Sequence, residues 1–503
     1  MHKRWITGAL CCGTLVSWAQ EKPNIIIINA DDLGYGDVSC NNPSCRVNTH
    51  NIDHLAAQGL RFENMHATSA TSTPSRFSLL TGTYAWRVPG TGVARGDAAM
   101  IITPQMNTIP KMLKSAGYVT AAVGKWHLGL GDESGKQDWN GTITPGLCDI
   151  GFDYSYIMAA TADRVPCVYI ENGRVVGLDP KDPIQVSYTT NFEGQPTGAL
   201  NPELLTKQRP SHGHDGTIVN GISRIGFMSG GHSARWSDET IADSITSKAL
   251  NFIRLNQQTP FFLYLATNDI HVPRYPHSRF IGQSGMGVRG DAILEFDWTV
   301  GQVVGLLDSL NLTDNTLIII TSDNGPVVDD GYKDHSLELL GEHRPSGGLR
   351  GGKYGIYEGG TRVLGVVSWR GHITAAKVSR APISHVDFYR SLSSIVGQDL
   401  QPQEAADSQD ISAALMGKTS LGRSEIVEHA YTYSITVGPW KYIMPSRGMK
   451  VAWQTGNPTG NSPEPQLFNL KNDPAEKVNR ANELPRKVAF LAHKLEVIIN
   501  KKD

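Results

Sequence analysis

Two pairs of adjacent oxygen-bearing side chains follow apolar, β-branched runs in this 503-residue sequence. Asp31-Asp32 comes after the run at residues 24–29, and Asp323-Asn324 comes after the run at residues 317–321. Carboxylate and amide oxygens suit Ca²⁺ or Mg²⁺ rather than Zn²⁺, and adjacent carboxylates repel each other unless a cation lies between them. Either pair alone is more often a solvated turn, so the metal-site hypothesis depends on both pairs together.

A small nucleophile stands in the segment Ser72-Thr73-Pro74-Ser75-Arg76, ahead of a proline-fixed turn and an arginine at the mouth of a predicted helix. By itself this string is also typical of an ordinary capped helix. Lys125 and His127 stand two residues apart in Gly124-Lys125-Trp126-His127-Leu128-Gly129. This spacing puts both side chains on the same side of an extended segment.

These motifs together resemble those of the formylglycine-dependent (type I) sulfatases of the alkaline-phosphatase-like superfamily. The Ser72 segment, followed by Leu80-Thr81-Gly82, is similar to the family signature, in which a Cys or Ser at the first position is oxidised to formylglycine. The segment with Lys125 and His127 is similar to the family's GKWHxG element, and both oxygen-bearing pairs match its metal motifs. His271 and Lys353 match two further family positions. The resemblance extends through most of residues 23–480.

The resemblance implies a calcium ion that holds the formylglycine and a sulfate oxygen. Its expected ligands are Asp31, Asp32, Asp323, Asn324 and the modified Ser72. A sulfate ester needs its anionic oxygens neutralised, a nucleophile in line with the sulfur, and an acid for the leaving oxygen. The family pattern assigns the first task to Ca²⁺ with Arg76, Lys125 and Lys353, the second to the hydrated formylglycine, and the third to His271. His127 would take a proton as sulfate is expelled, an exit that an unmodified serine does not have.

By the same resemblance, serine rather than cysteine at position 72 implies a maturation enzyme of the anaerobic radical type, which accepts serine, and therefore a bacterial periplasm. A Cys-to-Ser substitution made to trap substrate would give the same sequence. Residues 1–19 are typical of a signal peptide, with Lys3-Arg4, an apolar stretch, and small residues before a cleavage site after Ala19. Cys11, preceded by Leu10, is a poor lipoprotein site. We therefore expect an exported protein, periplasmic or secreted.

The substrate is expected to be a sulfated glycan, because the whole chain resembles carbohydrate sulfatases of gut Bacteroidetes. Asp163 and Arg164 are candidates for gripping vicinal sugar hydroxyls, since the carboxylate accepts hydrogen bonds and the guanidinium donates them. An ordinary ion pair is the alternative. His212 and His214 are further candidates for the pocket or simple loop residues. We expect an exo-acting 6-O-sulfatase on galactose or N-acetylgalactosamine of mucin or glycosaminoglycan, with 4-O- and 3-O-sulfates as alternatives.

Two other functions fit part of the pattern. A phosphodiesterase or phosphonate hydrolase of the same superfamily would share the fold and the metal edge, but the set formed by Lys125, His127 and Lys353 favours sulfate. A non-catalytic sugar-binding relative would normally have lost a site residue, whereas every matched position is filled here apart from the Ser/Cys ambiguity.

The elements that must position these residues follow the pattern of a doubly wound α/β fold. Continuous apolar runs at residues 24–29, 119–123, 261–266 and 317–321 are typical of strands buried on both faces, and they alternate with helical stretches such as residues 241–255. In open parallel sheets, ligands bind beyond the carboxyl ends of the strands. The polar clusters named above all stand there, as expected for an alkaline-phosphatase-like, mostly parallel sheet.

The chain length favours two domains. We expect a catalytic α/β domain over residues 20–380, with an irregular insertion at 129–237 that shapes the substrate pocket. A smaller α+β subdomain is expected over 381–503, with short antiparallel strands within 425–444 and 466–470 before a last helix at 484–499.

Composition excludes several classes of protein. With 40% hydrophobic and 19% charged residues, a net charge of −2 and no basic block, the chain carries no electrostatic signature of nucleic-acid or anionic-membrane binding. The apolar N-terminal stretch is too short to span a bilayer, so no stable membrane insertion is expected. After cleavage four cysteines remain, for which Cys40-Cys45 and Cys148-Cys167 are plausible disulfides and a fully reduced set is the alternative.

Overall fold

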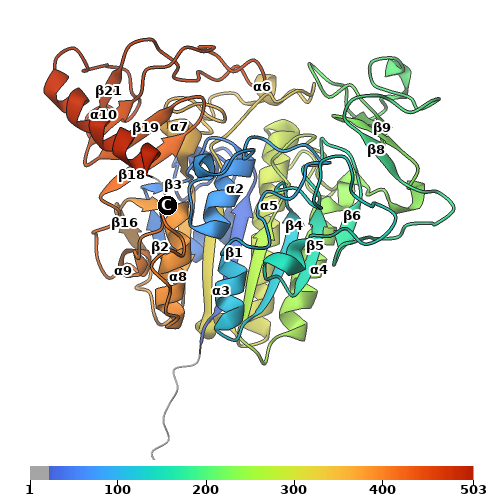
Figure 1. The fold of residues 1–503 in the computed structure, drawn as a ribbon, viewed down its shortest axis with the longest axis horizontal. Helices are drawn as coiled ribbons and strands as arrows, with labels where there is room; N and C mark the ends of the chain where they lie inside the picture. Colours follow the sequence, from blue (N-terminus) through green and yellow to red (C-terminus); the bar gives the residue numbers. More distant parts are fainter. Residues whose placement is uncertain (1–21, 502–503) are drawn as a thin grey trace, which may run out of the picture.

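A ten-stranded sheet, in the order β16-β2-β15-β13-β1-β12-β4-β5-β6-β7, forms the centre of the computed structural model, which describes residues 22–501 (Figure 1). Five adjacent strands in its middle run parallel to one another. They are β13 (Thr316–Ser322), β1 (Asn24–Ala30), β12 (Phe261–Ala266), β4 (Val119–Lys125) and β5 (Tyr154–Met158). The predicted mostly parallel sheet is confirmed, and four of these strands are the runs recognised in the sequence.

Short strands flank this parallel centre on both sides. On one side β15 (Gly365–Ser368) pairs antiparallel with β13, and β2 (Leu60–Phe62) and β16 (Lys377–Ser379) follow outward. On the other side β6 (Tyr169–Glu171) and β7 (Arg174–Val175) continue antiparallel from β5. The outer strands are only two to four residues long, which limits the unpaired backbone that the sheet exposes at its margins.

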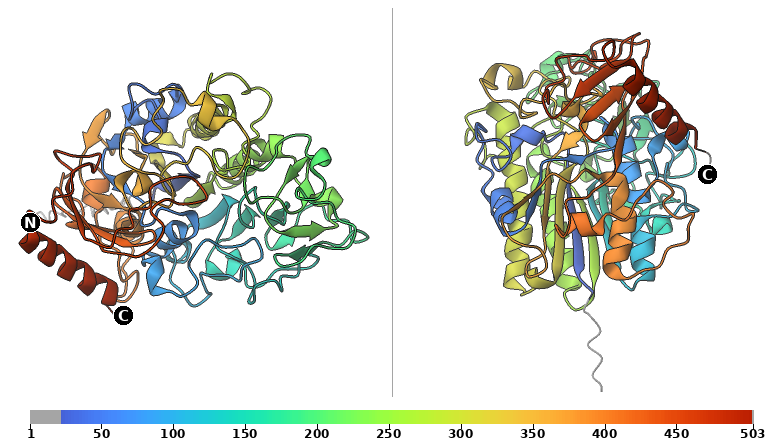
Figure 2. Two further views of the ribbon diagram at one scale, coloured as in Figure 1. Left: turned by 90° about the horizontal axis from the view of Figure 1, so that it is seen from above. Right: turned by 90° about the vertical axis from the view of Figure 1, so that its left-hand side faces the viewer.

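Helices cover both faces of the sheet, as the two views in Figure 2 make clear. The group on one face is α1 (His50–Gln58), α4 (Ile241–Leu255) and α5 (Gly287–Ser309). The group on the other face is α2 (Ser72–Thr81), α3 (Ile109–Ser115) and α8 (Phe388–Val396). The helix predicted at residues 241–255 is confirmed as α4. This three-layer arrangement explains why β1 reads as a continuous apolar run rather than an alternating one.

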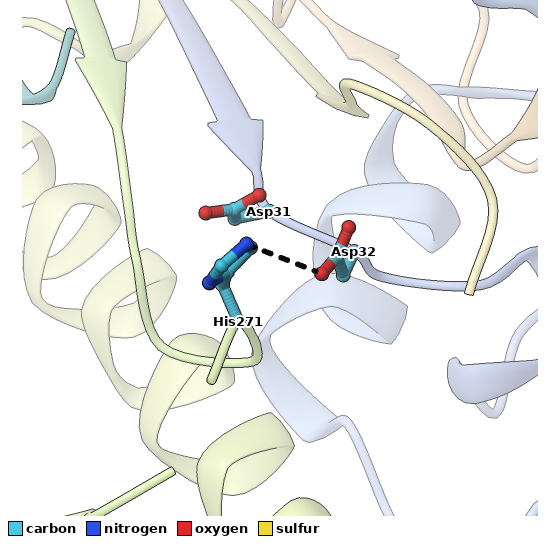
Figure 3. Close-up of side chains that lie close together, drawn as sticks. All are labelled: Asp31, Asp32 and His271. Atoms are coloured by element: carbon cyan, nitrogen blue, oxygen red, sulfur yellow. Dashed lines mark ion pairs between the residues drawn. The ribbon is translucent and has the colours of Figure 1, made fainter. Parts of the chain in front are cut away.

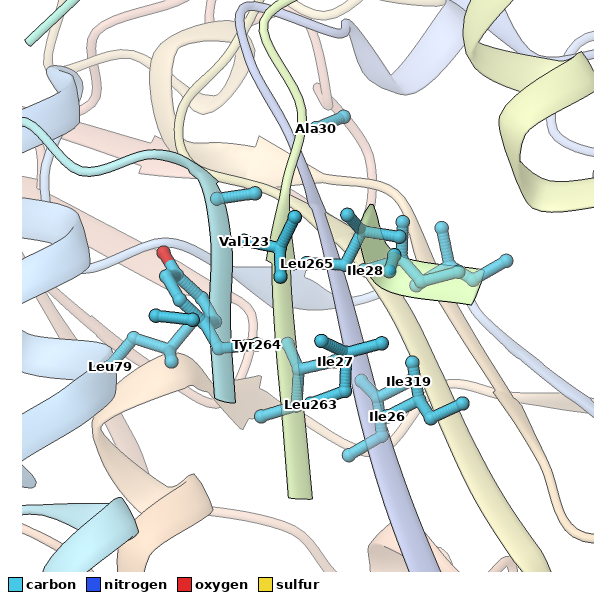
Figure 4. Packing of buried hydrophobic residues seen from close by; sticks show 14 of the residues in the cluster. Ile26, Ile27, Ile28, Ala30, Leu79, Val123, Leu263, Tyr264, Leu265 and Ile319 are labelled. Carbon is cyan, nitrogen blue, oxygen red and sulfur yellow. The ribbon is translucent and has the colours of Figure 1, made fainter. Parts of the chain in front are cut away.

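The hydrophobic core includes β1, whose side chains from Ile25 to Ile28 are fully buried, and Figure 4 shows Ile26, Ile27 and Ile28 among their neighbours. Ile26 stands opposite Leu263 of β12 and Ile318 of β13 in the strand register. Burying one such side chain stabilises the fold by about 1.5–3 kcal/mol. The strands are therefore held rigidly up to their carboxyl ends, where the polar clusters begin.

A four-stranded antiparallel sheet forms the C-terminal part of the described chain. Its strands are β18 (Glu425–His429), β19 (Tyr433–Val437), β20 (Trp440–Ile443) and β21 (Gln466–Asn469), and α10 (Pro485–Asn500) packs against β19 and β20. The predicted C-terminal strands and last helix are confirmed. The boundary at residue 380 stays a prediction, since α8 lies beyond it and packs against α2 and α3.

The range predicted as an insertion, 129–237, is irregular only in part. Strands β5, β6 and β7 extend the main sheet, because Tyr154–Met158 supplies enough apolar and aromatic side chains to pair with β4. The rest is mostly irregular but includes two small two-stranded sheets, β8 (Gln185–Ser187) with β11 (Phe227–Ser229), and β9 (Ile218–Val219) with β10 (Ile222–Ser223).

The predicted disulfides are wrong. All four cysteines in the described part of the chain are free: Cys40, Cys45, Cys148 and Cys167. The Cys167 thiol is buried and lies 3.7 Å from the carbonyl oxygen of Arg164, whereas Cys148 is exposed, so sequence proximity did not bring these two side chains into a common environment. Burial raises the pKa of Cys40 to about 12, which keeps that thiol protonated.

The predicted signal peptide, residues 1–19, lies outside the described residues. Among residues 22–501, no helix has the length and apolar character needed to cross a bilayer.

A buried charge cluster joins the C-terminal sheet to the main body. Lys441 Nζ of β20 donates to Glu358 Oε1 at 2.9 Å and lies 3.2 Å from Glu428 Oε2 of β18. His66 Nδ1 lies 2.7 Å from the other oxygen of Glu428. Lys441, Glu358 and Glu428 are fully buried. The ammonium group is the cation that the two carboxylates share, and Arg362 provides a second counter-charge for Glu358.

Replacing Lys441 with methionine is expected to lower the free energy of unfolding by about 3–5 kcal/mol, because it removes the ammonium group that the buried carboxylates of Glu358 and Glu428 share. Urea unfolding followed by tryptophan fluorescence measures the change. The matched control is Lys471→Met at an exposed position just after β21, for which a change within about 0.5 kcal/mol is expected. Equal effects of the two substitutions would contradict this account of the cluster.

Candidate active site at the carboxyl edge of the sheet

The two oxygen-bearing pairs meet because β1 and β13 are neighbouring parallel strands. Asp31-Asp32 follows β1, Asp323-Asn324 follows β13, and all four side chains are fully buried. Asn324 Nδ2 donates to Asp32 Oδ1 at 2.7 Å, and the backbone N–H of Asp32 donates to Asp323 Oδ1 at 3.3 Å. The two pairs therefore form one cluster at the edge of the sheet.

Three basic side chains neutralise this cluster. Lys125 Nζ, at the end of β4, donates to both carboxylate oxygens of Asp31 at 2.7 Å. Arg76 of α2 donates from Nε and Nη2 to Asp323 Oδ2 at 2.9 and 2.7 Å. Lys353 Nζ donates to Asp32 Oδ2 at 2.8 Å.

The carboxylates respond differently to this environment. Burial raises the pKa of Asp31 to about 8, even though Lys125 opposes the change. Burial also acts to raise the pKa of Asp323, but the charges of Arg76 and Lys125 outweigh it and hold that pKa below its usual range. Asp31 is thus the carboxylate least compensated by the protein's own cations.

Ser72 is the first residue of α2 and lies directly beside the cluster. Its Oγ is 2.9 Å from Lys125 Nζ and 3.5 Å from both Asp31 Oδ1 and Asn324 Oδ1. The side chain is buried, and the helix presents its N-terminus, the end that favours negative charge, at this point. An anion bound at Ser72 would therefore meet both a helix N-terminus and a lysine.

Two histidines contribute imidazoles to the site. His271 follows β12, and its Nε2 lies 3.9 Å from Asp32 Oδ2 while Nδ1 lies 2.7 Å from the carbonyl oxygen of Val272 (Figure 3). Burial and the charge of Lys353 lower the pKa of His271 to about 4, against the opposing effect of Asp32. This imidazole is therefore neutral at neutral pH in the absence of a bound anion.

His127 has its tautomer set by the backbone. Its Nε2 lies 2.9 Å from the carbonyl oxygen of Ala94, and because a carbonyl only accepts, Nε2 must carry the proton. Nδ1 has no hydrogen-bond partner among the described residues and is left as a basic lone pair. Burial, followed by the charge of Lys125, lowers the pKa of His127 well below its usual value. β4 ends at Lys125 and His127 has a φ of 59°, so strand alternation is not what places it.

A pocket of about 460 Å³ opens above this cluster. Its lining includes Ser72, His127, His271 and Lys353. It also includes the four residues predicted to contact a sugar, which are Asp163, Arg164, His212 and His214. All the residues predicted from the sequence are therefore brought together in one place, the acidic set with Arg76 and Lys125 below the floor of the pocket and the others on its walls.

Asp163 is the centre of the polar wall. Arg164 Nη1 donates to its Oδ1 at 2.8 Å, and His214 Nε2 lies 2.9 Å from its Oδ2. Burial acts to raise the pKa of Asp163, but Arg164 and the nearby histidines hold it well below its usual value. The carboxylate is thus ionised and already hydrogen-bonded. His212 is turned toward the C-terminal part of the chain, with Nε2 2.8 Å from the carbonyl oxygen of Gln454.

Sequence reasoning missed several lining residues. Lys353 Nζ has a second partner, Asp330 Oδ2, at 2.8 Å, and Tyr354, Trp453 and Gln454 also line the pocket. The acidic pair that contains Asp330 stands only six residues after Asn324, which was a usable signal. Trp453 and Gln454 lie in an irregular C-terminal segment, where no motif marked them.

The acidic cluster fits a hard divalent cation. Asp31, Asp32 and His271 each offer a ligand atom, and these atoms all lie within 4.8 Å of one another. The raised pKa of Asp31 marks a carboxylate whose burial is not fully compensated, and a cation beside it would favour the ionised form. Oxygen donors from Asp31, Asp32, Asp323 and Asn324 are of the type that such ions take.

The charged site at the edge of a parallel sheet is suited to binding an anionic ester, and comparison with known proteins identifies the family. The family model named Sulfatase matches residues 23–398. The chain therefore belongs to the sulfatase family and is a sulfate ester hydrolase, in agreement with the resemblance of its motifs.

Similar proteins extend over nearly the whole chain. An N-acetylgalactosamine-6-O-sulfatase of Bacteroides thetaiotaomicron is 52% identical over 95% of this chain and 93% of its own. A steryl-sulfatase of Rattus norvegicus is 31% identical over 90% of this chain and 84% of its own. A solved structure from Bacteroides thetaiotaomicron, designated 6S-sulf in work on glycosaminoglycan metabolism, has a TM-score of 0.94 at 51% identity and covers 95% of this chain and 100% of its own.

Replacing Asp163 with asparagine is expected to lower the pKa of His214. Burial alone lowers that pKa, and the hydrogen bond and charge of Asp163 raise it above its ordinary value in the native protein. The imidazole pKa can be measured by NMR titration. The control is Asp182→Asn, in which the carboxylate beside the exposed His232 is replaced instead. An unchanged His214 pKa in the Asp163 variant would contradict the described electrostatics of the pocket wall.

Proposed function

We propose that the protein is an exported, calcium-dependent, exo-acting sulfatase that removes the 6-O-sulfate of N-acetylgalactosamine or galactose in host glycans such as mucin or glycosaminoglycan, using formylglycine derived from Ser72. The observation that carries the proposal is the position of Ser72 Oγ, 2.9 Å from Lys125 Nζ, 3.5 Å from two oxygens of the acidic cluster and in the lining of the pocket. The name of the 52% identical relative supports the sugar and the position of its sulfate.

The bound groups and the protein's own residues divide the chemistry. Formylglycine would supply the nucleophilic oxygen, and Ca²⁺ held by Asp31, Asp32, Asp323 and Asn324 would supply positive charge beside it. The ammonium groups of Lys125 and Lys353 and the guanidinium of Arg76 are already directed at the carboxylates around Ser72. They are therefore positioned to share their charge with the oxygens of a sulfate bound at the same point.

The histidines are suited to opposite proton transfers. His127 Nδ1 is a basic nitrogen with no partner among the described residues, in a buried position, which suits removal of a proton close to Ser72. His271 Nε2 lies on the pocket side near Asp32. A bound sulfate would add negative charge beside this imidazole and raise its pKa, so that it can carry the proton needed by the leaving sugar oxygen.

The polar wall is suited to select the sugar. Asp163 is an ionised acceptor held by Arg164 and His214. A sugar with two hydroxyls directed at this wall would gain hydrogen bonds to both the carboxylate and the guanidinium, and an epimer with one hydroxyl turned away would lose one of them. Discrimination between isomers of the sugar would follow from this geometry.

Maturation and export complete the proposal. Conversion of Ser72 requires a maturation enzyme, which we propose to be of the anaerobic radical type, and it must occur before folding because Ser72 is only 2% exposed in the folded chain. The signal peptide at residues 1–19 would then direct the protein to the periplasm or beyond.

The proposed function is tested with protein produced together with a radical-type maturation enzyme. Mass spectrometry of the peptide containing Ser72 is expected to show the loss of two hydrogens. For the converted protein, kcat/KM for N-acetylgalactosamine 6-sulfate is expected to exceed that for the 4-sulfate and for glucosamine 6-sulfate by about tenfold or more. Faster turnover of bis(4-nitrophenyl) phosphate than of any sulfate ester would instead favour a phosphodiesterase.

Replacing His271 with alanine is expected to lower kcat for a sugar sulfate by about 10²- to 10⁴-fold, because the departing alcohol then has no proton donor. An aryl sulfate, whose phenolate leaves without protonation, is expected to lose less than about tenfold. Comparison of kcat for the two esters measures the effect. His277→Ala, on the loop after His271 and with its ring near Arg279, serves as the control. A similar loss on both esters would contradict the assigned role.

A further inference from the structure

A second pocket adjoins the one above Ser72. It has a volume of about 240 Å³ and shares Thr71, Val93 and Tyr354 with the first pocket. Thr71 directly precedes Ser72 in the chain, so the second pocket opens beside the position of the proposed nucleophile. The two pockets therefore form one continuous surface along which a substrate larger than a single sugar can extend.

Several aromatic side chains form part of the wall of the second pocket. Trp86 lies flat against Tyr84 with 4.1 Å between ring centroids, and Tyr431 stacks on Tyr354 at 6.3 Å. Trp86, Tyr431 and Tyr354 all line the pocket, and Tyr431 is 40% exposed. Ring packing holds these aromatic faces in place before any ligand binds. A sugar ring has an apolar face of C–H groups that packs on such surfaces with little ordering cost.

The second pocket is uncharged, in contrast to the first. None of the described residues that line it is acidic or basic apart from His429, and burial lowers the pKa of His429 to about 4, which leaves it neutral. The first pocket, by comparison, is lined by Arg164 and Lys353. A sulfated sugar or a uronic acid in the second pocket would lose its hydration without meeting a cation, whereas a neutral sugar would not carry that cost.

We propose that this second pocket binds an uncharged sugar ring joined to the sulfated residue, so that the protein acts on a sulfated sugar still linked to a neutral neighbour. The proposal rests on the proposed function and narrows it: the preferred glycan has a neutral sugar, not a uronic acid, next to the sulfated one. The volume of about 240 Å³ is suited to one ring rather than a long chain.

The most direct test places a large side chain at the rim of the second pocket. Gly92 lines the second pocket and not the first, a Cβ at this position meets no atom within 4 Å, and its φ lies outside the left-handed region. Gly92→Trp should therefore fold normally and occupy the space, while Gly92→Ala leaves the space open and serves as the matched control.

Three substrates separate the possible outcomes: a 6-sulfated N-acetylgalactosamine, the same residue linked to a neutral hexose, and the same residue linked to a uronic acid. In the native protein, kcat/KM is expected to be about two- to tenfold higher for the neutral disaccharide than for the monosaccharide, with no such gain for the uronic acid disaccharide. Gly92→Trp is expected to abolish the gain and leave the monosaccharide unchanged. Gly92→Ala should keep it.

A second pair of variants tests the aromatic face. Tyr431→Ala is expected to reduce the gain for the neutral disaccharide by about two- to tenfold, and Tyr431→Phe, which keeps the ring, is expected to preserve it. The pocket proposal is overturned if the native protein shows no gain, if the uronic acid disaccharide is preferred, or if Gly92→Trp leaves the gain intact. Absence of activity on all three sugars in native, formylglycine-containing protein would instead overturn the proposed function, and the pocket proposal with it.

Discussion

The fully buried carboxylates at one edge of the sheet are the constraint on which the rest of the site depends. Asp31, Asp32 and Asp323 place three carboxyl groups in the interior, where an isolated charge is very costly. The protein offsets this cost by directing Lys125, Lys353 and Arg76 at the carboxyl groups of Asp31, Asp32 and Asp323, respectively. The positive groups that suit sulfate binding are therefore also the groups that make the acidic cluster tolerable in the folded state.

The parallel sheet is what allows this concentration of charge. Five strands in register end at one edge, and the packed core around β1 fixes where each strand ends. The end of β4 supplies Lys125, and short segments after β1, β13 and β12 supply the acidic pairs and His271, whose Nε2 lies 3.9 Å from Asp32 Oδ2. The N-terminus of α2 completes the edge with Ser72, so a nucleophile position, anion-binding donors and acid–base groups all derive from chain directions that the sheet imposes.

The sequence predicted the sheet centre and the charged floor well, and the reasons are physical. Runs such as Ile25 to Ile28 admit few structures other than a strand buried on both faces, and the ends of such strands must meet at one edge. Side-chain positions that depend on irregular chain were not predictable in this way. Trp453 reaches the pocket from far along the sequence, β5 to β7 were hidden in a segment rich in Gly and Pro, and the cysteine spacing said nothing about which thiols face each other.

The pocket combines two layers of different origin. Its floor comes from strand ends and α2, whereas its wall and rim come from loops, with His212 Nε2 resting against the carbonyl oxygen of Gln454 across a sequence separation of 242 residues. Loops of this kind accept substitution and insertion much more readily than buried strand ends. Substitutions in the loops of the wall and rim can therefore change which sulfated compound is bound, while the charged residues below the pocket stay the same.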